Sequence, residues 1–227
     1  HADIVVIGNG MVGHHFVATL SEIKPELSIS VFGEETHPAY DRVHLSEVFA
    51  GKAPEELALT SELAYRRLGV RSHFGEKVVA IDTASRQIET ASGLISSYGQ
   101  LVLATGSYPF VPPIPGHDLP GCFVYRTLDD LEAIRNAATN ARRGVVIGGG
   151  LLGLECANAL QNLGLDTHVV EFAPGLMGVQ LDDDGSAKLR SLIERLGVTI
   201  HTSTATDSIE ASELGLLMQF AEIGRAH

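Results

Sequence analysis

The chain has 227 residues, of which 44% are hydrophobic, so it is long enough for one large or two modest packed domains. Its 28 acidic and 16 basic residues give a net charge of −12 at pH 7. This balance argues against a nucleic-acid partner, because phosphate binding needs clustered Lys and Arg. No apolar run approaches the roughly 20 residues that span a bilayer. We expect no secretory signal and no membrane attachment, since Asp3 and Gly8 interrupt the first apolar run.

The two cysteines, Cys122 and Cys156, lie far apart and outside any C-x-x-C motif. This pattern favours a reducing, cytoplasmic setting and predicts neither a disulfide framework nor a redox-active dithiol. It also predicts no iron–sulfur cluster held within the chain. We interpret both cysteines as packing residues.

The first predicted elements are a strand over residues 3–8, a helix over 11–23 and a second, parallel strand over 27–32. An irregular stretch over 34–51 and a polar helix near 61–68 follow. Four short strand-like runs come next, at 71–74, 78–81, 87–90 and 94–97. Their spacing indicates an antiparallel insertion rather than another crossover helix.

A glycine motif, G-x-G-x-x-G, joins the first strand to the first helix through Gly8, Gly10 and Gly13, with Met11 and Val12 between the last two. The first glycine permits a tight turn, the second lets the backbone approach a pyrophosphate, and the third lets the helix pack closely on the strand. The helix N-terminus then offers free N–H groups and a partial positive charge to phosphates. The motif predicts a dinucleotide site.

A further buried strand is predicted to end in the small residues Ala104, Thr105 and Gly106. Small residues at the carboxyl end of a strand let a ligand come close in the crevice of an open α/β sheet. A buried strand that simply meets a turn would have the same sequence pattern, so this alternative stays open.

Residues 109–120 contain five prolines, which predict an extended segment that connects two domains. A helix over 128–139 follows, with Thr127 as its N-cap. The remaining predicted elements are a strand, a helix, a strand, a helix, a strand and a final pair of strands, at 144–148, 151–163, 166–171, 184–196, 198–201 and within 204–220.

The glycine motif returns in this second half as Gly148, Gly150 and Gly153, with Leu152 before the third glycine. It again lies between a predicted strand and a predicted helix. One such motif alone is weak support for a site. Two copies 140 positions apart indicate two dinucleotides in one protein.

Each motif is followed by an acid at the end of the next predicted strand, where an acid accepts hydrogen bonds from a ribose. Glu34, with Glu35 beside it, lies 21 residues after Gly13, and Glu171 lies 18 residues after Gly153. An acid at Glu171 favours the free 2′-hydroxyl of NADH and would repel the 2′-phosphate of NADPH. The alternative is that these glutamates are solvated strand ends.

Asp182, Asp183 and Asp184 could suggest a metal site, but an acid-rich N-terminus of the following helix explains them more simply. The histidines show no partner spacing typical of acid–base catalysis or metal binding. We therefore predict no metal site and no catalytic side chain.

The order of these motifs resembles the flavoprotein oxidoreductases that bind two dinucleotides, over essentially all of residues 2–221. Several longer strings narrow the resemblance to the large subunits of NADH-dependent nitrite reductases: residues 33–35 with 38–46, 101–116, 122–128, 148–154 and 169–177. Two departures stand out. Gly99 replaces an acid that usually follows Tyr98, a loss expected to weaken a local turn without abolishing FAD binding, and the family's closing segment of the FAD domain, with its G-D motif, is not found.

The resemblance implies that the first motif holds the FAD pyrophosphate, that Glu34 holds the FAD ribose, and that Ala104 to Gly106 line the flavin side. It implies phosphate contacts from Arg42 and backbone contacts to adenine from Val79. In the second motif, the glycines and Glu171 would bind NADH, with Glu155 near the nicotinamide. Simpler interpretations stay open for two of these residues. Arg42 could be an ordinary surface arginine, and Glu155 could be an acid that favours the helix dipole near the start of its helix.

The predicted fold is α/β, with two Rossmann-like, doubly wound, three-layer units: an FAD domain over 1–112, incomplete at its C-terminal side, and an NADH domain over 113–221. The resemblance implies hydride transfer from NADH to FAD and electron passage onward to reduce nitrite to ammonium. Iron–sulfur and sirohaem centres would lie only in the remainder of the intact protein, and the resemblance implies a small subunit and a homodimer as its partners. Two alternatives are a stand-alone reductase of a rubredoxin or ferredoxin and a non-enzymatic FAD- and NADH-binding protein.

The two ends of the sequence are unusual. The chain starts at His1, and its last six residues, 222–227, are what a sequencing-adapter read would encode. We expect the native sequence to end near Ala221 and the last six residues to be an artefact.

Overall fold

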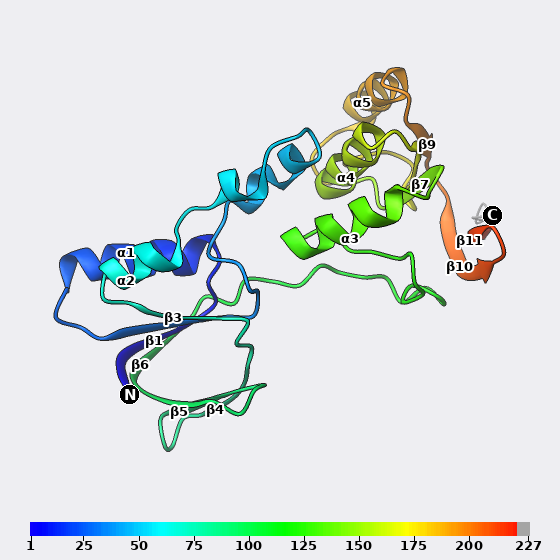
Figure 1. Ribbon diagram of the computed structural model, residues 1–227. Helices are drawn as coiled ribbons and strands as arrows, with labels where there is room; N and C mark the ends of the chain where they lie inside the picture. Colours follow the sequence, from blue (N-terminus) through cyan, green and yellow to red (C-terminus); the bar gives the residue numbers. More distant parts are fainter. Residues whose placement is uncertain (222–227) are drawn as a thin grey trace. The chain divides into compact units, whose positions relative to one another are not determined.

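A computed structural model describes residues 1–221, and the predicted artefact at 222–227 lies outside the described residues (Figure 1). The chain divides into two compact units. The first unit contains His1–His44 and Ala53–Tyr108; the second contains Leu45–Lys52 and the chain from Pro109 onward. The predicted domain boundary after residue 112 falls in the same proline-rich stretch as the division after Tyr108. Residues 45–52 belong to the second unit although the sequence places them within the predicted first domain.

The first unit is built on one six-stranded sheet in the order β3-β2-β1-β6-β5-β4. Its parallel half contains β1 (Ala2–Ile7), β2 (Ile29–Gly33) and β3 (Arg71–Phe74) beside β6 (Ile95–Leu103), and its antiparallel half adds β5 (Gln87–Thr90) and β4 (Val78–Asp82). The predicted antiparallel insertion is confirmed for the runs at 78–81, 87–90 and 94–97. For the run at 71–74 the prediction was wrong, because β3 pairs parallel with β2 at the other edge of the sheet.

The strands predicted at 94–97 and from residue 101 are in fact one continuous strand, β6. Tyr98 and Gln100 pair with Ala2 and Ile4 of β1, and residues 101–103 continue the same ladder. At Gly99 the backbones of β6 and β1 approach each other closely, because a Cβ there would be 2.7 Å from the carbonyl oxygen of Asp3. The expectation that the missing acid at this position affects a local turn was wrong, since the position lies within a strand.

Side chains are buried on both faces of this sheet. One face packs against α1 (Met11–Ile23) and α2 (Glu62–Arg67) through a core that includes Val6, Val17 and Tyr65. The opposite face holds a second core with Val5, Phe32 and Ile88. Two 3₁₀ helices, η1 (Arg42–Val48) and η2 (Pro54–Leu57), lie in the connection after β2.

The second unit contains a parallel sheet in the order β7-β8-β9, formed by Arg143–Ile147, Asp166–Val170 and Thr199–His201. Helices α4 (Leu151–Asn162) and α5 (Asp183–Arg195) connect these strands, and α3 (Leu128–Ala138) precedes them (Figure 1). A hairpin of β10 (Ala205–Ser212) and β11 (Gly215–Ala221) follows. The predicted α/β fold with two parallel β-α-β units is thus confirmed.

Capping explains where two of these helices begin. Thr127 and Asp130 form a reciprocal capping box at the start of α3. The Asp182 carboxylate accepts the Gly185 N–H at 2.8 Å and caps α5, so the acidic run marks a helix start, as predicted.

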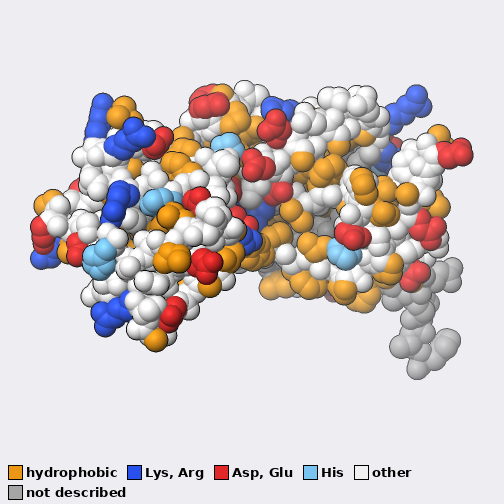
Figure 2. All heavy atoms as spheres, turned by 60° about the horizontal axis from the view of Figure 1, so that its bottom comes forward, with side chains coloured by type: hydrophobic (Ala, Val, Ile, Leu, Met, Phe, Trp, Pro, Cys, Tyr) orange, Lys and Arg blue, Asp and Glu red, His pale blue; other side chains and the backbone are white. Residues whose placement is uncertain are grey.

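The described residues contain no helix with the length and apolar character needed to cross a membrane. On the face of these residues shown in Figure 2, Lys and Arg side chains are interspersed with acidic and hydrophobic ones, and no extended basic patch covers that face. Both cysteines are free thiols.

Candidate functional site

The first glycine loop connects β1 to α1, and its three glycines have different structural roles. Gly8 has a φ of +109°, and a Cβ there would lie 2.1 Å from the carbonyl oxygen of Ala104. A Cβ on Gly13 would lie 2.0 Å from the carbonyl oxygen of Gly8. Gly10 is different, because a Cβ there would meet no protein atom within 4 Å. The protein's own packing requires Gly8 and Gly13, whereas Gly10 leaves a bare backbone facing open space.

The second glycine loop, between β7 and α4, repeats this arrangement. Gly148 has a φ of +113°, and a Cβ on Gly153 would lie 2.0 Å from the Gly148 carbonyl oxygen. A Cβ on Gly150 would again meet no protein atom within 4 Å. Both loops therefore leave the backbone open at the middle glycine, where the motif predicts a pyrophosphate.

The helices that follow the two loops have N-termini unlike those of α3 and α5. Neither α1 nor α4 has a side-chain cap or an acidic residue in its first turn. In contrast, α3 and α5 have both. The first residues after the caps are apolar and exposed instead: Met11, Val12, Leu151 and Leu152. The free N–H groups and partial positive charge at α1 and α4 are thus available to an anion.

Glu171 lies directly after β8, beside the second loop. One carboxylate oxygen accepts the Gly149 N–H at 2.6 Å and the other accepts the Ala173 N–H at 2.7 Å. The Glu171 N–H donates to the His201 carbonyl at 2.8 Å, which fixes the backbone as well. A carboxylate has about four acceptor positions, so this group can still accept bonds from ribose hydroxyls.

The first unit has no acid at the corresponding position. Gly8 N–H donates to the Phe32 carbonyl just as Gly148 N–H donates to the Val170 carbonyl, at 2.8 Å in both units. Gly33 therefore corresponds to Glu171, and Glu34 lies one residue further on. A Cβ on Gly33 would lie only 3.0 Å from the Cβ of Asn9, so this side chain of the glycine loop fills the place.

Glu34 instead belongs to an exposed cluster. Its two carboxylate oxygens accept Lys77 Nζ at 2.7 Å and the Tyr108 hydroxyl at 2.9 Å. The hydrogen bond from Lys77 is the main cause that lowers the pKa of Glu34, and the same bond raises the pKa of Lys77.

Glu35 has different partners from Glu34. It accepts the Tyr40 hydroxyl at 2.5 Å through one oxygen and an Arg42 guanidinium N–H through the other. The structure thus brings Arg42 to Glu35, a pairing that the sequence analysis did not anticipate.

The other residues predicted for the first unit lie at strand ends or irregularities. Ala104 follows β6 and donates its N–H to the Ile7 carbonyl at 2.7 Å, which places it against the glycine loop. Thr105 and Gly106 come next and are exposed. Val79 lies in β4 at a shift of register, between Val78 and Ala80, and has no partner residue on β5. Its backbone is consequently open to contacts from outside the sheet.

A buried polar link beside the first loop was missed by the sequence analysis. The Tyr65 hydroxyl donates to Asn9 Oδ1 at 2.7 Å and lies 3.1 Å from His14 Nδ1. Tyr65 is fully buried, and burial raises its pKa while it lowers that of His14. Within the described residues, Asn9 Nδ2 is buried without a hydrogen-bond partner. Asn9, the middle residue of Gly8-Asn9-Gly10, could have indicated this link, because a buried polar side chain needs a hydrogen-bond partner.

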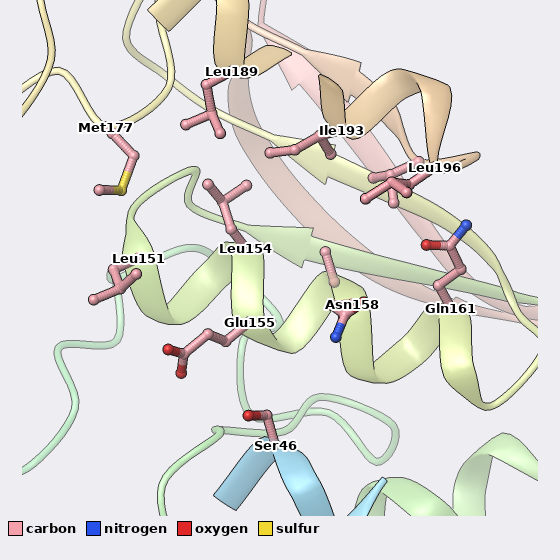
Figure 3. A pocket seen from close by; sticks show the side chains of 12 residues that line it. Ser46, Leu151, Leu154, Glu155, Asn158, Gln161, Met177, Leu189, Ile193 and Leu196 are labelled. Atoms are coloured by element: carbon pink, nitrogen blue, oxygen red, sulfur yellow. The ribbon is translucent and has the colours of Figure 1, made fainter. Parts of the chain in front are cut away.

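A cavity of about 350 Å³ lies in the second unit between α4 and α5 (Figure 3). Its lining is mostly aliphatic, and its polar side chains include Glu155, Asn158 and Ser46. In Figure 3 the Glu155 carboxylate extends from α4 on the side of Ser46, away from Leu189 and Ile193 of α5. Glu155 is half-buried, one turn into α4. Burial raises the pKa of the neighbouring Cys156 thiol to about 11, which agrees with a packing role for this cysteine.

Comparisons with known proteins agree with this geometry. The family described as pyridine nucleotide-disulphide oxidoreductase matches residues 2–222. The chain is 54% identical to the nitrite reductase [NAD(P)H] large subunit of Klebsiella oxytoca over 96% of the chain and 23% of that protein. It is 48% identical to the nitrite reductase (NADH) large subunit of Escherichia coli, again over 96% of the chain and 26% of that protein. The chain therefore spans about a quarter of the length of these relatives.

A solved structure has the same fold. The ferredoxin reductase of the CYP199A2 system from Rhodopseudomonas palustris superposes with a TM-score of 0.88 at 28% identity, over 97% of the chain and 55% of that protein. The two glycine loops thus lie within an architecture already seen in a redox enzyme.

Proposed function

The chain belongs to the pyridine nucleotide-disulphide oxidoreductase family, and we propose that it is the electron-entry part of an NADH-dependent flavoprotein. The observation that carries this proposal is the repeated glycine loop, with an open middle glycine followed by a helix that has no side-chain cap and no acid in its first turn. Two such loops, one in each unit, suit two dinucleotides.

The first unit would hold FAD. Gly10 and the N-terminus of α1 would meet the pyrophosphate, and Arg42 would add a positive charge. Ala104 to Gly106 would line the flavin side, and the open backbone at Val79 suits adenine. Bound FAD would supply the ability to accept a hydride and release single electrons. In this proposal the protein contributes position and electrostatics, and no side chain is assigned a catalytic role.

The second unit would hold NADH. Gly150 and the N-terminus of α4 would meet its phosphates, and Glu171 would accept the hydroxyls of the adenosine ribose. A 2′-phosphate would meet the fixed Glu171 carboxylate, so NADH is preferred to NADPH. Glu155 is proposed to lie near the nicotinamide.

The similarity to nitrite reductase large subunits, at 54% and 48% identity, supports a place in the reduction of nitrite to ammonium. In this proposal the intact protein is cytoplasmic. The iron–sulfur and sirohaem centres that receive the electrons belong to its remaining length, and a small subunit or a second copy completes the assembly. A stand-alone reductase that serves a ferredoxin-like carrier is the second candidate, favoured by the fold shared with a ferredoxin reductase.

Anaerobic titration of the FAD-loaded intact protein with NADH tests the proposal. We expect NADH to bleach the flavin absorbance with one equivalent per FAD, followed by reoxidation when an electron acceptor is added. An intact protein that binds FAD and NADH without bleaching would indicate a non-enzymatic binding protein. An intact protein that binds neither dinucleotide would contradict the proposal.

A further inference from the structure

Glu35 is held on three sides. Besides its bonds to Tyr40 and Arg42, its carbonyl oxygen accepts the Gly75 N–H at 2.9 Å. The side chain is only 22% exposed, whereas that of Glu34 is 49% exposed. Both Glu35 carboxylate oxygens accept from side chains, and one of these is the charged guanidinium of Arg42. Glu171 instead accepts only backbone N–H groups, so it is Glu35 that can hold mobile side chains in place.

Arg42 is correspondingly well oriented. Its guanidinium carbon lies 4.8 Å above the centre of the Tyr40 ring, and Glu35 accepts one of its N–H groups. Tyr40 is itself buried and pairs with Ala58 in an isolated bridge. A guanidinium has five N–H donors in a rigid plane, so a carboxylate on one edge orients the others.

This cluster lies at the edge of the sheet that carries the first glycine loop. Glu35 is two residues beyond Gly33, whose missing Cβ accommodates the Asn9 side chain of that loop. The loop and the turn after β2 are further joined by the bond from Gly8 N–H to the Phe32 carbonyl. The fixed guanidinium therefore belongs to the same end of β1 and β2 as the open backbone of Gly10.

We propose that Glu35 is a positioning residue that holds Arg42 for the phosphates of the first dinucleotide and does not itself contact the ribose. The proposal rests on the proposed function, because it assumes a dinucleotide in the first unit. The proposal gives Glu35 a role different from the ribose contact, whereas spacing along the sequence alone could not distinguish Glu35 from Glu34.

The change in FAD affinity on replacing Glu35 is predicted to be opposite to the change expected from charge alone. Removing a negative charge near a phosphate site should strengthen binding if charge alone decided the outcome. If Glu35 orients Arg42, its replacement should weaken binding, because the guanidinium would lose its fixed plane.

The experiment measures the dissociation constant of FAD by flavin fluorescence for the chain and for Glu35→Gln, Arg42→Met and the double variant. We expect Glu35→Gln to weaken FAD binding about fivefold or more, and the double variant to bind no more weakly than Arg42→Met alone. Glu62→Gln is the matched control, since Glu62 pairs with Arg66 in an exposed pair on α2. Thermal unfolding of each ligand-free variant shows whether it is folded.

ADP and adenosine, used as competitors of FAD, separate phosphate from ribose contacts. We expect Glu35→Gln to weaken ADP by the same factor as FAD and to leave adenosine unchanged. Equal losses for ADP and adenosine would show a ribose contact and overturn the proposal, as would tighter FAD binding or additive effects of the two substitutions. These variants are made in the intact protein, and failure of the unsubstituted intact protein to bind FAD would instead overturn the proposed function, and the inference with it.

Tyr40→Phe gives a second route to the same answer if Glu35→Gln fails to fold. It removes the other partner of Glu35 while both charges stay in place. We expect weaker binding of FAD and ADP, again with adenosine unchanged. Unchanged binding of FAD in a folded Tyr40→Phe variant would contradict a positioning role that depends on both partners.

Discussion

Glu171 uses both of its oxygens to accept backbone N–H groups, one from the glycine loop and one from its own turn. Its carboxylate is thereby fixed beside the place proposed for the adenosine ribose. A fixed negative charge discriminates against a phosphate more strongly than a mobile one, because it cannot turn away.

We predict that Glu171→Gln lowers the preference for NADH over NADPH by about tenfold, since the charge that repels the 2′-phosphate is lost. The measurement is the dissociation constant of each nucleotide for both chains. Glu194→Gln, which removes an exposed charge paired with Arg190 on α5, is the control and should leave the ratio unchanged. An unchanged ratio in Glu171→Gln would assign the discrimination to other residues.

The sequence predicted which residues form the loops but not all of their partners. Counting from the third glycine placed Glu34 and Glu171 in comparable positions, yet the strand register matches Glu171 with Gly33. The difference arises because Asn9 fills from the loop the space that Glu171 fills from the strand end. Such an exchange of side chains between neighbouring backbones leaves no trace in spacing along the chain.

At the scale of elements, Tyr65 joins α2 to both the first glycine loop and α1. Its hydroxyl lies within hydrogen-bond distance of Asn9 and of His14. Because the group is fully buried, losing it leaves two polar side chains without their partner.

We predict that Tyr65→Phe lowers the free energy of unfolding by about 1–3 kcal/mol, the usual cost of leaving a buried polar group unpaired. Chemical denaturation checks this value. Tyr108→Phe is the control, because Tyr108 is 75% exposed and its loss should change stability by less than about 0.5 kcal/mol. Equal effects of the two substitutions would show that the buried link contributes nothing.

Three partly desolvated histidines give the fold a dependence on pH. Desolvation lowers the pKa of His14 on α1, His73 on β3 and His201 on β9 below the ordinary value of 6.5. The unfolded chain therefore binds more protons than the folded one in mildly acidic solution. The stability from these groups is complete above pH 6.5 and declines as the pH falls toward their lowered pKa values.

We predict that His73→Phe makes stability less sensitive to a fall in pH from about 7.5 to 5.5. The ring of His73 stacks on Phe32 at 4.3 Å, and phenylalanine keeps this stacking without titrating. The free energy of unfolding measured at both pH values gives the result. A larger loss of stability in the variant than in the parent chain would contradict the assignment.

Most element positions could be predicted because hydrophobic periodicity and caps are local. Helices α1, α3, α4 and α5 lie within one residue of their predicted ends. The merging of two predicted strands into β6 could not be foreseen, because Gly99 was taken as a turn residue. Only the pairing with β1 shows that a bare backbone is needed there.

At the scale of the whole molecule, the chain repeats the same strand–glycine loop–helix arrangement in two compact units. Each unit contains a parallel β-α-β arrangement with an open middle glycine, and each buries apolar side chains. The repeat and the family could be predicted from the sequence, because the glycine motifs are local and specific. The membership of residues 45–52 in the second unit could not, since it depends on contacts between segments far apart in the chain.

The central claim is that the two glycine loops bind different dinucleotides, and Gly10→Val and Gly150→Val test it most directly. A Cβ at either position meets no protein atom within 4 Å, so both variants should fold. We predict that Gly10→Val abolishes FAD binding and keeps that of NADH, while Gly150→Val does the reverse, as measured by the stoichiometry of each bound dinucleotide. Unchanged binding in both variants, or the loss of both dinucleotides in either one while it remains folded, would contradict the account.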